Sequence, residues 1–327
     1  MYPEVRIMYS QIIFAAVSAF LLCTGLGPLA IFYLQRLKVG QNIRDQGPRR
    51  HQAKAGTPTM GGLVIIFAFT LATLYFAPKN AFTFLALGFT VGYGILGFWD
   101  DFKKIALDNS LGLRAREKLL GQFGLAAVLA LWVMGPAGLG TWILLPIVGT
   151  RLELGYLYIP FVLLLIVFVS NAVNLTDGLD GLAAGTTSIA LLAYIPITLA
   201  QGRLELAVFA GSVAGACLGF LWFNSYPAQI FMGDTGSLAL GGALTSIAVL
   251  TKTELWLVII GGIFVLEGLS VIIQVIFYRL TGGRVFRMSP IHHHFELSGW
   301  PENRVVTRFW IMGVVLALFG IGVWYYS

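Results

Sequence analysis

Charged residues are scarce in this sequence. Only 11% of its 327 residues are Asp, Glu, Lys or Arg and 57% are hydrophobic, against about 25% charged and roughly 45–50% apolar residues in an ordinary soluble domain. So little charge excludes a water-soluble globular protein. The chain is predicted to be an integral membrane protein, because its apolar residues gather in runs long enough to cross a bilayer.

Cysteine is also scarce, and a cleavable signal is not expected. Cys23 and Cys217 both lie inside apolar runs, which argues against a disulfide or a metal-binding pair. The first apolar run, 12–33, is long enough to span a membrane, and only Arg6 stands before it as a basic leader.

The expected fold class is an all-α polytopic membrane protein that forms a single domain over residues 1–327. Its apolar runs predict about ten transmembrane helices. They cover roughly 10–36, 61–77, 81–99, 119–135, 159–174, 182–200, 206–223, 237–252, 254–279 and 305–326. Residues 142–158 alternate around Gly149-Thr150, which is typical of a short β-hairpin.

The distribution of basic residues predicts the orientation in the membrane. Sixteen of the 21 Lys and Arg residues follow the first, third and ninth spans. By the positive-inside rule these connections are cytoplasmic, so both termini and the hairpin are periplasmic. The net charge of +6 is thus explained by topology rather than by a nucleic-acid partner, and attraction to anionic lipid or an anionic substrate is a second, compatible explanation.

Every polar cluster of interest falls on that same predicted side, and the outer connections at 78–80, 201–205 and 252–254 are short and chemically plain. One-sided clusters favour an enzyme. An ion-coupled transporter is the rival, and it predicts a polar path to the other face and solute uptake into vesicles.

The stretch 170–185 is the most informative of these clusters. Asn174, Asp177 and Asp180 are three apart, so on a helix they share one face. Gly178 leaves room for a ligand to approach the backbone. The alternative without a functional role is a polar loop between two helices, in which Asp or Asn caps a helix end.

Two further segments bring acids to the same side. Asp100-Asp101 end the third span, where two neighbouring carboxylates repel and attract a cation or share a proton. Asp234 stands at the predicted start of the eighth span, where free N–H groups favour phosphate. Either motif also fits a helix end with a solvated charge or an N-cap, and Phe231 fits a membrane anchor as well as a platform for a base.

Two loops complete the pattern. Residues 49–62 combine cations, hydroxyls and glycines, which suits a diphosphate or a juxtamembrane basic patch. His292, His293 and His294 suggest zinc, but neighbours in sequence point apart and no cysteine is near, so contacts to phosphate or hydroxyl groups are favoured. Carboxylates without thiols beside Lys and Arg indicate Mg²⁺ shared with substrate phosphates, and so phosphoryl transfer.

Five motifs resemble the polyprenyl-phosphate N-acetylhexosamine-1-phosphate transferase superfamily over essentially the whole chain. They are GTPTMGG at 56–62, Asp100-Asp101, NLTDGLD at 174–180, FMGDTGS at 231–237 and SPIHHHFE at 289–296. The histidine triplet resembles the branch acting in peptidoglycan biosynthesis. That branch transfers phospho-MurNAc-pentapeptide from UDP-MurNAc-pentapeptide to undecaprenyl phosphate, giving lipid I and UMP, on the cytoplasmic face of the bacterial inner membrane. A sister enzyme that moves N-acetylglucosamine phosphate is the alternative.

The resemblance implies roles for individual residues. Asp234, Asp100 and Asp101 are the implied residues of the Mg²⁺ site. The implied catalytic residues are Asp100, Asp101, Asp234 and His292, with Asp100 as the base for the lipid phosphate. Phe231 stacks on uracil. The other implied substrate-binding residues are Lys54, Thr59, Lys104, Lys118, Asn174, Asp177, Gly178, Leu179, Asp180, Asn224, Gly233, Gln274 and His293. The resemblance also implies a homodimer. Direct attack by the lipid phosphate is preferred over a covalent phosphosugar on a carboxylate.

Overall fold

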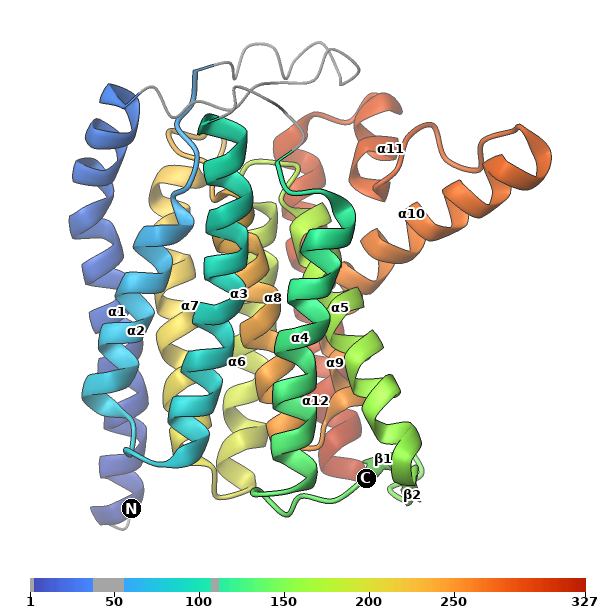
Figure 1. Ribbon diagram of the computed structural model, residues 1–327. Coiled ribbons are helices and arrows are strands. Elements are labelled where there is room, and N and C mark those ends of the chain that lie inside the picture. The colour runs from blue at the N-terminus through green and yellow to red at the C-terminus, as the bar shows by residue number, and fades with distance from the viewer. Residues whose placement is uncertain (1–2, 38–55, 107–111) are drawn as a thin grey trace.

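The computed structural model describes residues 3–37, 56–106 and 112–327, and these residues are almost entirely helical (Figure 1). The α-helices are α1 (Pro3–Arg36), α2 (Gly62–Phe76), α3 (Ala81–Ala106), α4 (Ala115–Met134), α5 (Tyr158–Thr176), α6 (Leu182–Ala200), α7 (Leu204–Asn224), α8 (Gly233–Leu250), α9 (Glu254–Ile260), α10 (Gly262–Thr281), α11 (Ile291–Leu297) and α12 (Glu302–Tyr326). A short 3₁₀ helix (Gly155–Leu157) precedes α5.

The predicted hairpin is confirmed. Strands β1 (Trp142–Leu144) and β2 (Arg151–Glu153) pair antiparallel, with Trp142 opposite Glu153. The turn between them passes through Gly149, whose φ of +65° lies in the left-handed region that favours glycine.

Eight helices in the described part of the chain are long and apolar enough to cross a membrane, which makes this a multi-pass membrane protein. They are α1, α3, α4, α5, α6, α7, α10 and α12. Of the other predicted spans, α2 has only 15 residues and α8 begins with the polar turn 233–237. Both runs are nonetheless helical, so the predicted runs are placed correctly while the number of crossings stays a prediction.

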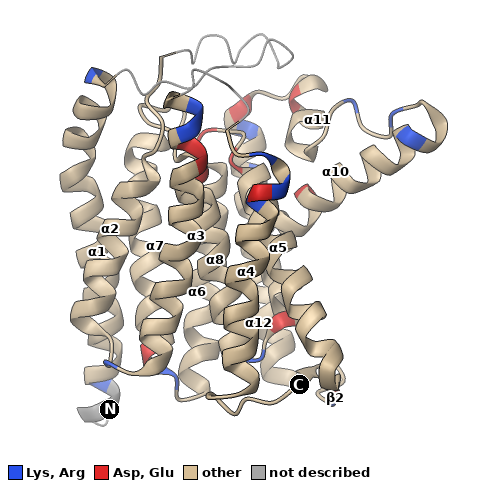
Figure 2. Cartoon of the chain, in the orientation of Figure 1, with Lys and Arg blue, Asp and Glu red and all other residues tan. Residues whose placement is uncertain are grey.

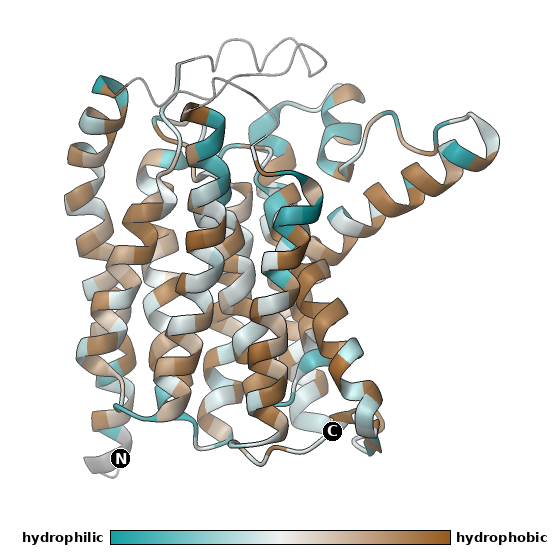
Figure 3. Cartoon of the chain, in the orientation of Figure 1, coloured by the Kyte–Doolittle hydropathy of each residue, from teal (hydrophilic) through white to brown (hydrophobic). Residues whose placement is uncertain are grey.

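The ninth predicted run, 254–279, is not one continuous helix. The helix stops at Gly261, whose backbone (φ −89°, ψ 21°) leaves helical geometry and separates α9 from α10. Beyond this break α10 leans away from the bundle (Figure 1). The stretch of α10 before its last turn is apolar (Figure 3) and exposed, as at Ile276, which suits a helix surrounded by lipid.

Helix α8 lies at the centre of the bundle. Every residue from Thr235 to Leu250 is buried, and the helix packs against α2, α3 and α5. Glycines allow the closest approach at its start, since a Cβ on Gly62 would lie 2.1 Å from the backbone nitrogen of Gly236. The start of α8 is therefore held between α2 and α3.

The two ends of the bundle differ. The two chain termini and the hairpin lie at one end (Figure 1), and most Lys, Arg, Asp and Glu residues gather at the other (Figure 2). The connection at 252–254 is not plain, contrary to expectation. Lys252 and Glu254 are both buried, with Nζ and Oε1 3.4 Å apart, and Tyr158 donates its hydroxyl to the same carboxylate at 2.6 Å.

Candidate active site

The Asp234 carboxylate is the point at which four helices meet. It lies in the first turn of α8, and its Oδ2 is 3.0 Å from Nζ of Lys104 on α3 and 2.9 Å from Nζ of Lys118 on α4. Asn174 on α5 donates from Nδ2 to Asp234 Oδ1 and to Ser237 Oγ, both at 2.8 Å. Two cations and one amide thus orient a carboxylate whose side chain is 17% exposed.

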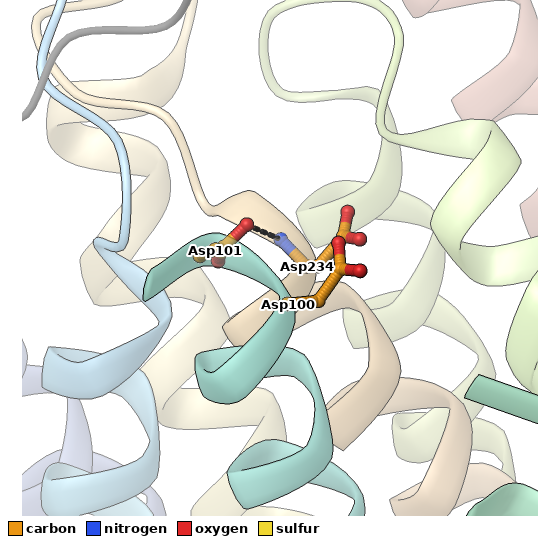
Figure 4. Close-up of side chains that lie close together, drawn as sticks. All are labelled: Asp100, Asp101 and Asp234. Atoms are coloured by element: carbon orange, nitrogen blue, oxygen red, sulfur yellow. Dashed lines mark hydrogen bonds between the residues drawn. The ribbon is translucent and has the colours of Figure 1, made fainter. Parts of the chain in front are cut away.

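Asp100 and Asp101 are neighbours in sequence but point to different sides of α3 (Figure 4). Asp100 forms an ion pair with Lys104 and accepts the backbone N–H of Leu113 at 2.8 Å. Asp101 faces the first turn of α8 and accepts the N–H of Asp234 at 3.1 Å. Their mutual repulsion is reduced because each carboxylate has its own hydrogen-bond donors.

A candidate metal site follows from this arrangement. In the residues that the structure describes, Asp100, Asp101 and Asp234 form the group that could hold an ion, with ligand oxygens all within 4.8 Å of one another. Hard carboxylate oxygens without nitrogen or sulfur suit Mg²⁺. Lys104 offsets only part of the negative charge of the three carboxylates, so a divalent cation fits the residues present.

The turn between α5 and α6 corrects one expectation. The spacing predicted that Asn174, Asp177 and Asp180 share one helical face, and this was wrong because α5 ends at Thr176. Gly181 then adopts φ +78°, which starts α6 in a new direction. Asn174 therefore reaches Asp234 from a helix, whereas Asp180 turns toward other partners.

Three elements hold this turn. The N–H of Asp180 donates to Glu302 Oε1 at the start of α12 at 2.8 Å, and Asp180 Oδ2 accepts the N–H of Ala228 at 2.9 Å. Asn224, the last residue of α7, accepts the N–H of Gly181 through Oδ1 at 3.1 Å. Asp180 and Asn224, predicted to contact substrate, thus fix the shape of the turn.

Asp177 is the acid of this turn with the strongest electrostatic perturbation. Loss of water around its carboxyl raises its pKa well above the ordinary value of 3.8, and the charges of Asp234, Asp101 and Asp180 raise that pKa further. A cation beside it would relieve that repulsion.

The three histidines on α11 make separate contacts. His292 is fully buried, with Nδ1 3.1 Å from Glu267 Oε1 on α10. His293 Nδ1 lies 2.7 Å from Glu296 Oε2, and His294 Nδ1 accepts a backbone N–H from the preceding loop at 3.1 Å. His292 and His294 thus tie α11 to α10 and to the loop before it, whereas the contact of His293 lies within α11.

His292 also packs directly against the α5–α6 turn. A Cβ added to Gly178 would lie 2.5 Å from His292 Nε2, so the two elements touch where only glycine fits. The next residue, Leu179, is buried beside Leu182 and Val305 in a small apolar cluster. Leu179 and Gly178 therefore tie the turn to α11 and α12.

The chain before α2 lies alongside the chain before α8. Phe231 donates its N–H to Pro58 O at 2.8 Å, and its carbonyl accepts the N–H of Gly61 at 2.9 Å. Gly233 has φ +72°, and a Cβ there would lie 2.9 Å from Thr59 Oγ1. Thr59, Phe231 and Gly233 are thus gathered at the start of α8, next to Asp234.

Two residues predicted to bind substrate, Gln274 and Lys54, are not placed at the start of α8 by the structure. The amide of Gln274 bonds the backbone of Val285 and Phe286 and so closes the loop after α10. Lys54 lies outside the residues that the structure describes.

Three residues at the site received no role from the sequence. Glu302 follows a proline at a helix start, where an acid is unremarkable in sequence terms. Thr235 lies inside a quoted motif, without a signal separating it from its neighbours. Glu267 carried a usable signal, since it is an acid in the middle of an apolar run.

The helical bundle and its acidic, lysine-flanked end define a multi-pass membrane protein with a candidate metal-binding active site, and comparison places it among the transferases. The family model described as glycosyl transferase family 4 matches residues 82–252. A phospho-N-acetylmuramoyl-pentapeptide-transferase signature matches residues 54–66.

Comparison with curated proteins identifies the family within the transferases. A phospho-N-acetylmuramoyl-pentapeptide-transferase from Pelotomaculum thermopropionicum is 56% identical over 90% of this chain and 92% of its own length. Proteins of the same name from Geobacillus sp. (strain WCH70) and Desulfitobacterium hafniense are 51% and 50% identical over 94% and 96% of this chain. The chain belongs to the phospho-N-acetylmuramoyl-pentapeptide-transferase family.

Proposed function

We propose that the protein transfers phospho-MurNAc-pentapeptide from UDP-MurNAc-pentapeptide to undecaprenyl phosphate, giving undecaprenyl-diphospho-MurNAc-pentapeptide and UMP. The observation that carries the proposal is the group of carboxylates Asp100 and Asp234 beside Lys104 and Lys118 at one end of an apolar bundle. Such an end suits a nucleotide diphosphate from water and a phosphate on a membrane lipid. The names of the relatives supply the transferred group.

Mg²⁺ is the proposed cofactor. Asp234 and Asp100 would hold it, since their carboxylates lie side by side (Figure 4). When bound, the ion supplies charge neutralisation for the diphosphate and for the departing UMP. Lys104 and Lys118 each form an ion pair with Asp234. With a cation bound to the carboxylates, these two lysines would be available to contact substrate phosphates.

The direct route fits these residues best. A lipid phosphate oxygen attacks the β-phosphorus of the nucleotide sugar, and the bond from that phosphorus to the bridging oxygen breaks, so that UMP leaves. Asp100 would hold or accept the proton of the lipid phosphate. Trapping a phosphosugar on Asp100 or Asp101 with nucleotide sugar alone would instead establish the covalent route.

The arrangement of the chain in the membrane is proposed with the activity. Residues 1–327 form one domain of ten spans in the bacterial inner membrane, with both termini and the hairpin periplasmic and the site facing the cytoplasm. Clustering of basic residues at the site's end supports this orientation (Figure 2). A homodimer is proposed on family resemblance.

The decisive experiment is an assay of the purified protein with radiolabelled UDP-MurNAc-pentapeptide and undecaprenyl phosphate, with and without Mg²⁺. We expect label to enter the lipid phase with equal release of UMP, and only with the cation. UMP release from UDP-N-acetylglucosamine instead would favour the sister transferase, and absence of transfer with either sugar would refute the proposal.

The role of Asp234 can be tested in the same assay. Asp234→Asn should lower kcat by about a thousandfold, since it removes a charge from the proposed metal site, while the protein still inserts and unfolds at a similar temperature. Normal turnover at normal Mg²⁺ would remove Asp234 from the metal site.

A further inference from the structure

The carboxylate of Asp101 is engaged with the first turn of α8. Its Oδ1 accepts the N–H of Asp234 at 3.1 Å, and its Oδ2 accepts the N–H of Thr235 at 2.9 Å and the Thr235 hydroxyl at 2.7 Å. Asp101 is 4% exposed and Thr235 is fully buried. Three donors from one helical turn therefore converge on one side chain of a different helix.

This contact supplies a cap that α8 lacks. The first N–H groups of an α-helix have no partner within the helix, and a side chain of the N-cap residue usually accepts them. Met232 stands at the N-cap of α8 and makes no such bond. Asp101 takes that place from α3, and its negative charge also suits the positive end of the helix dipole.

Helices α3 and α8 are in close contact at this point. A Cβ on Gly97, one turn before Asp101 on α3, would lie 2.1 Å from the carbonyl oxygen of Asp234. A Cβ on Gly233 would lie 2.6 Å from Asp101 Oδ2. Small residues on both sides thus bring the carboxylate within hydrogen-bond distance of the turn.

The carboxylate of Asp101 has few lone pairs available to bind a cation. An ionised carboxylate offers about four lone-pair positions, and the three donors from α8 occupy three of them. The ammonium group of Lys104 lies 3.6 Å from Oδ1. Asp100 differs, because its carboxylate lies beside that of Asp234 and makes none of these bonds to α8 (Figure 4).

We infer that Asp101 is a positioning residue rather than a metal ligand or base. It fixes the backbone of Asp234 and thereby aims the Asp234 carboxylate at Lys118, Asn174 and the candidate metal position. The inference rests on the proposed function for its consequence in catalysis, but the cap itself is a property of the protein without substrate or metal.

Hydrogen exchange measured by mass spectrometry tests the cap without any activity. In detergent, without metal or nucleotide, the peptide containing Asp234 and Thr235 should exchange at least about tenfold faster in Asp101→Ala than in the unmodified protein. Thr235→Val, which removes only the hydroxyl donor, should give a smaller increase, and Thr235→Ser should restore slow exchange. Asp100→Asn is the matched control and should leave this peptide unchanged.

Two further measurements show whether Asp101 positions Asp234 or binds the metal itself. They are the affinity for Mn²⁺, followed by electron paramagnetic resonance, and steady-state kinetics. Thr235→Val should lower kcat by about tenfold with little change in KM for the nucleotide sugar, and Thr235→Ser should rescue it. Asp234→Asn should abolish Mn²⁺ binding, whereas Asp101→Asn, which keeps one acceptor oxygen, should only weaken it.

Two results would overturn the inference. One is unchanged exchange of the α8 peptide in Asp101→Ala. The other is loss of Mn²⁺ binding in Asp101→Asn as complete as in Asp234→Asn, with Thr235→Val behaving like the unmodified protein. If Asp101→Ala does not fold, the Thr235 pair still decides, and if the protein transfers no phosphosugar, the exchange result still stands.

Discussion

At the scale of single residues, the aspartates of the site differ in their surroundings. Asp101 is buried and hydrogen-bonded to backbone, and Asp234 is partly exposed and faces two lysines. Asp177 is surrounded by other carboxylates, and burial together with their charges raises its pKa well above the ordinary value. Hydrogen-bond donors around a carboxylate favour its ionised form, and neighbouring carboxylates favour its protonated form. The same side-chain type can therefore position a helix, hold a cation or respond to pH.

The raised pKa of Asp177 predicts a pH-dependent stability. A folded pKa above the unfolded one means that the stabilisation is complete below the unfolded pKa and is lost as pH rises through the folded pKa. Asp177→Asn is neutral throughout, so its unfolding temperature should match the unmodified protein near pH 4 and exceed it increasingly toward pH 9. Thermal unfolding in detergent without divalent cations measures this. A difference that shrinks as the pH rises would contradict the pKa shift.

Gly178 predicts a steric effect. Gly178→Ala would put a Cβ 2.5 Å from His292 Nε2, and such overpacking costs about 1–3 kcal/mol. The unfolding temperature and the rate of UMP release should both fall. Gly88→Ala on α3 is the control, because a Cβ there meets nothing within 4 Å. Equal behaviour of the two variants would disprove direct packing of α11 on the turn.

At the scale of elements, the α5–α6 turn depends on residues far away in sequence. Its backbone donors end on Glu302 of α12 and Asn224 of α7, and its glycine contacts α11. Such a turn has no regular structure of its own to hold it, so its shape comes from the helices around it. The proposed substrate region is thus assembled by helix packing.

Glu302 offers a test of that dependence. Glu302→Ala would leave the buried N–H of Asp180 without its acceptor, which costs about 1–3 kcal/mol. We expect KM for the nucleotide sugar to rise about tenfold, with a smaller change in kcat. Glu302→Gln keeps an acceptor oxygen and should recover most of the affinity, and equal loss in both variants would show that the charge of Glu302 matters instead.

At the scale of the whole molecule, charge and hydropathy divide the bundle into a polar end and an apolar body (Figures 2 and 3). Both termini lie opposite the polar end (Figure 1). A charged side chain is costly in hydrocarbon, so the acids and lysines of the site belong at a membrane surface, where a water-soluble nucleotide and a lipid can meet.

The proposed orientation can be measured by cysteine labelling in intact cells. Tyr156→Cys beside the hairpin should react with a membrane-impermeant maleimide added outside, because residue 156 is 89% exposed. Arg116→Cys at the other end should react only after permeabilisation. The native Cys23 and Cys217 are buried and give a low background. The opposite pattern would invert the topology.

The sequence alone determined the class of protein, the positions of the helical runs, the hairpin and the kinds of side chain at the candidate site. These follow from local quantities: run length, alternation of side chains and the residue types at the polar end. The family motifs also come from short stretches, such as Asp100-Asp101 and the segment around Asp234.

Only the tertiary structure decided how these residues divide their work. The bond from Asp101 to Thr235 of α8 joins residues 134 positions apart, and the contacts of Lys104 and Lys118 with Asp234 join residues 130 and 116 positions apart. No local pattern encodes such pairings. The break at Gly261 was likewise not visible in the sequence, where residues 254–279 form one apolar run. Local sequence limits which side chains can do chemistry, and the distance and direction between helices decide which of them face one another.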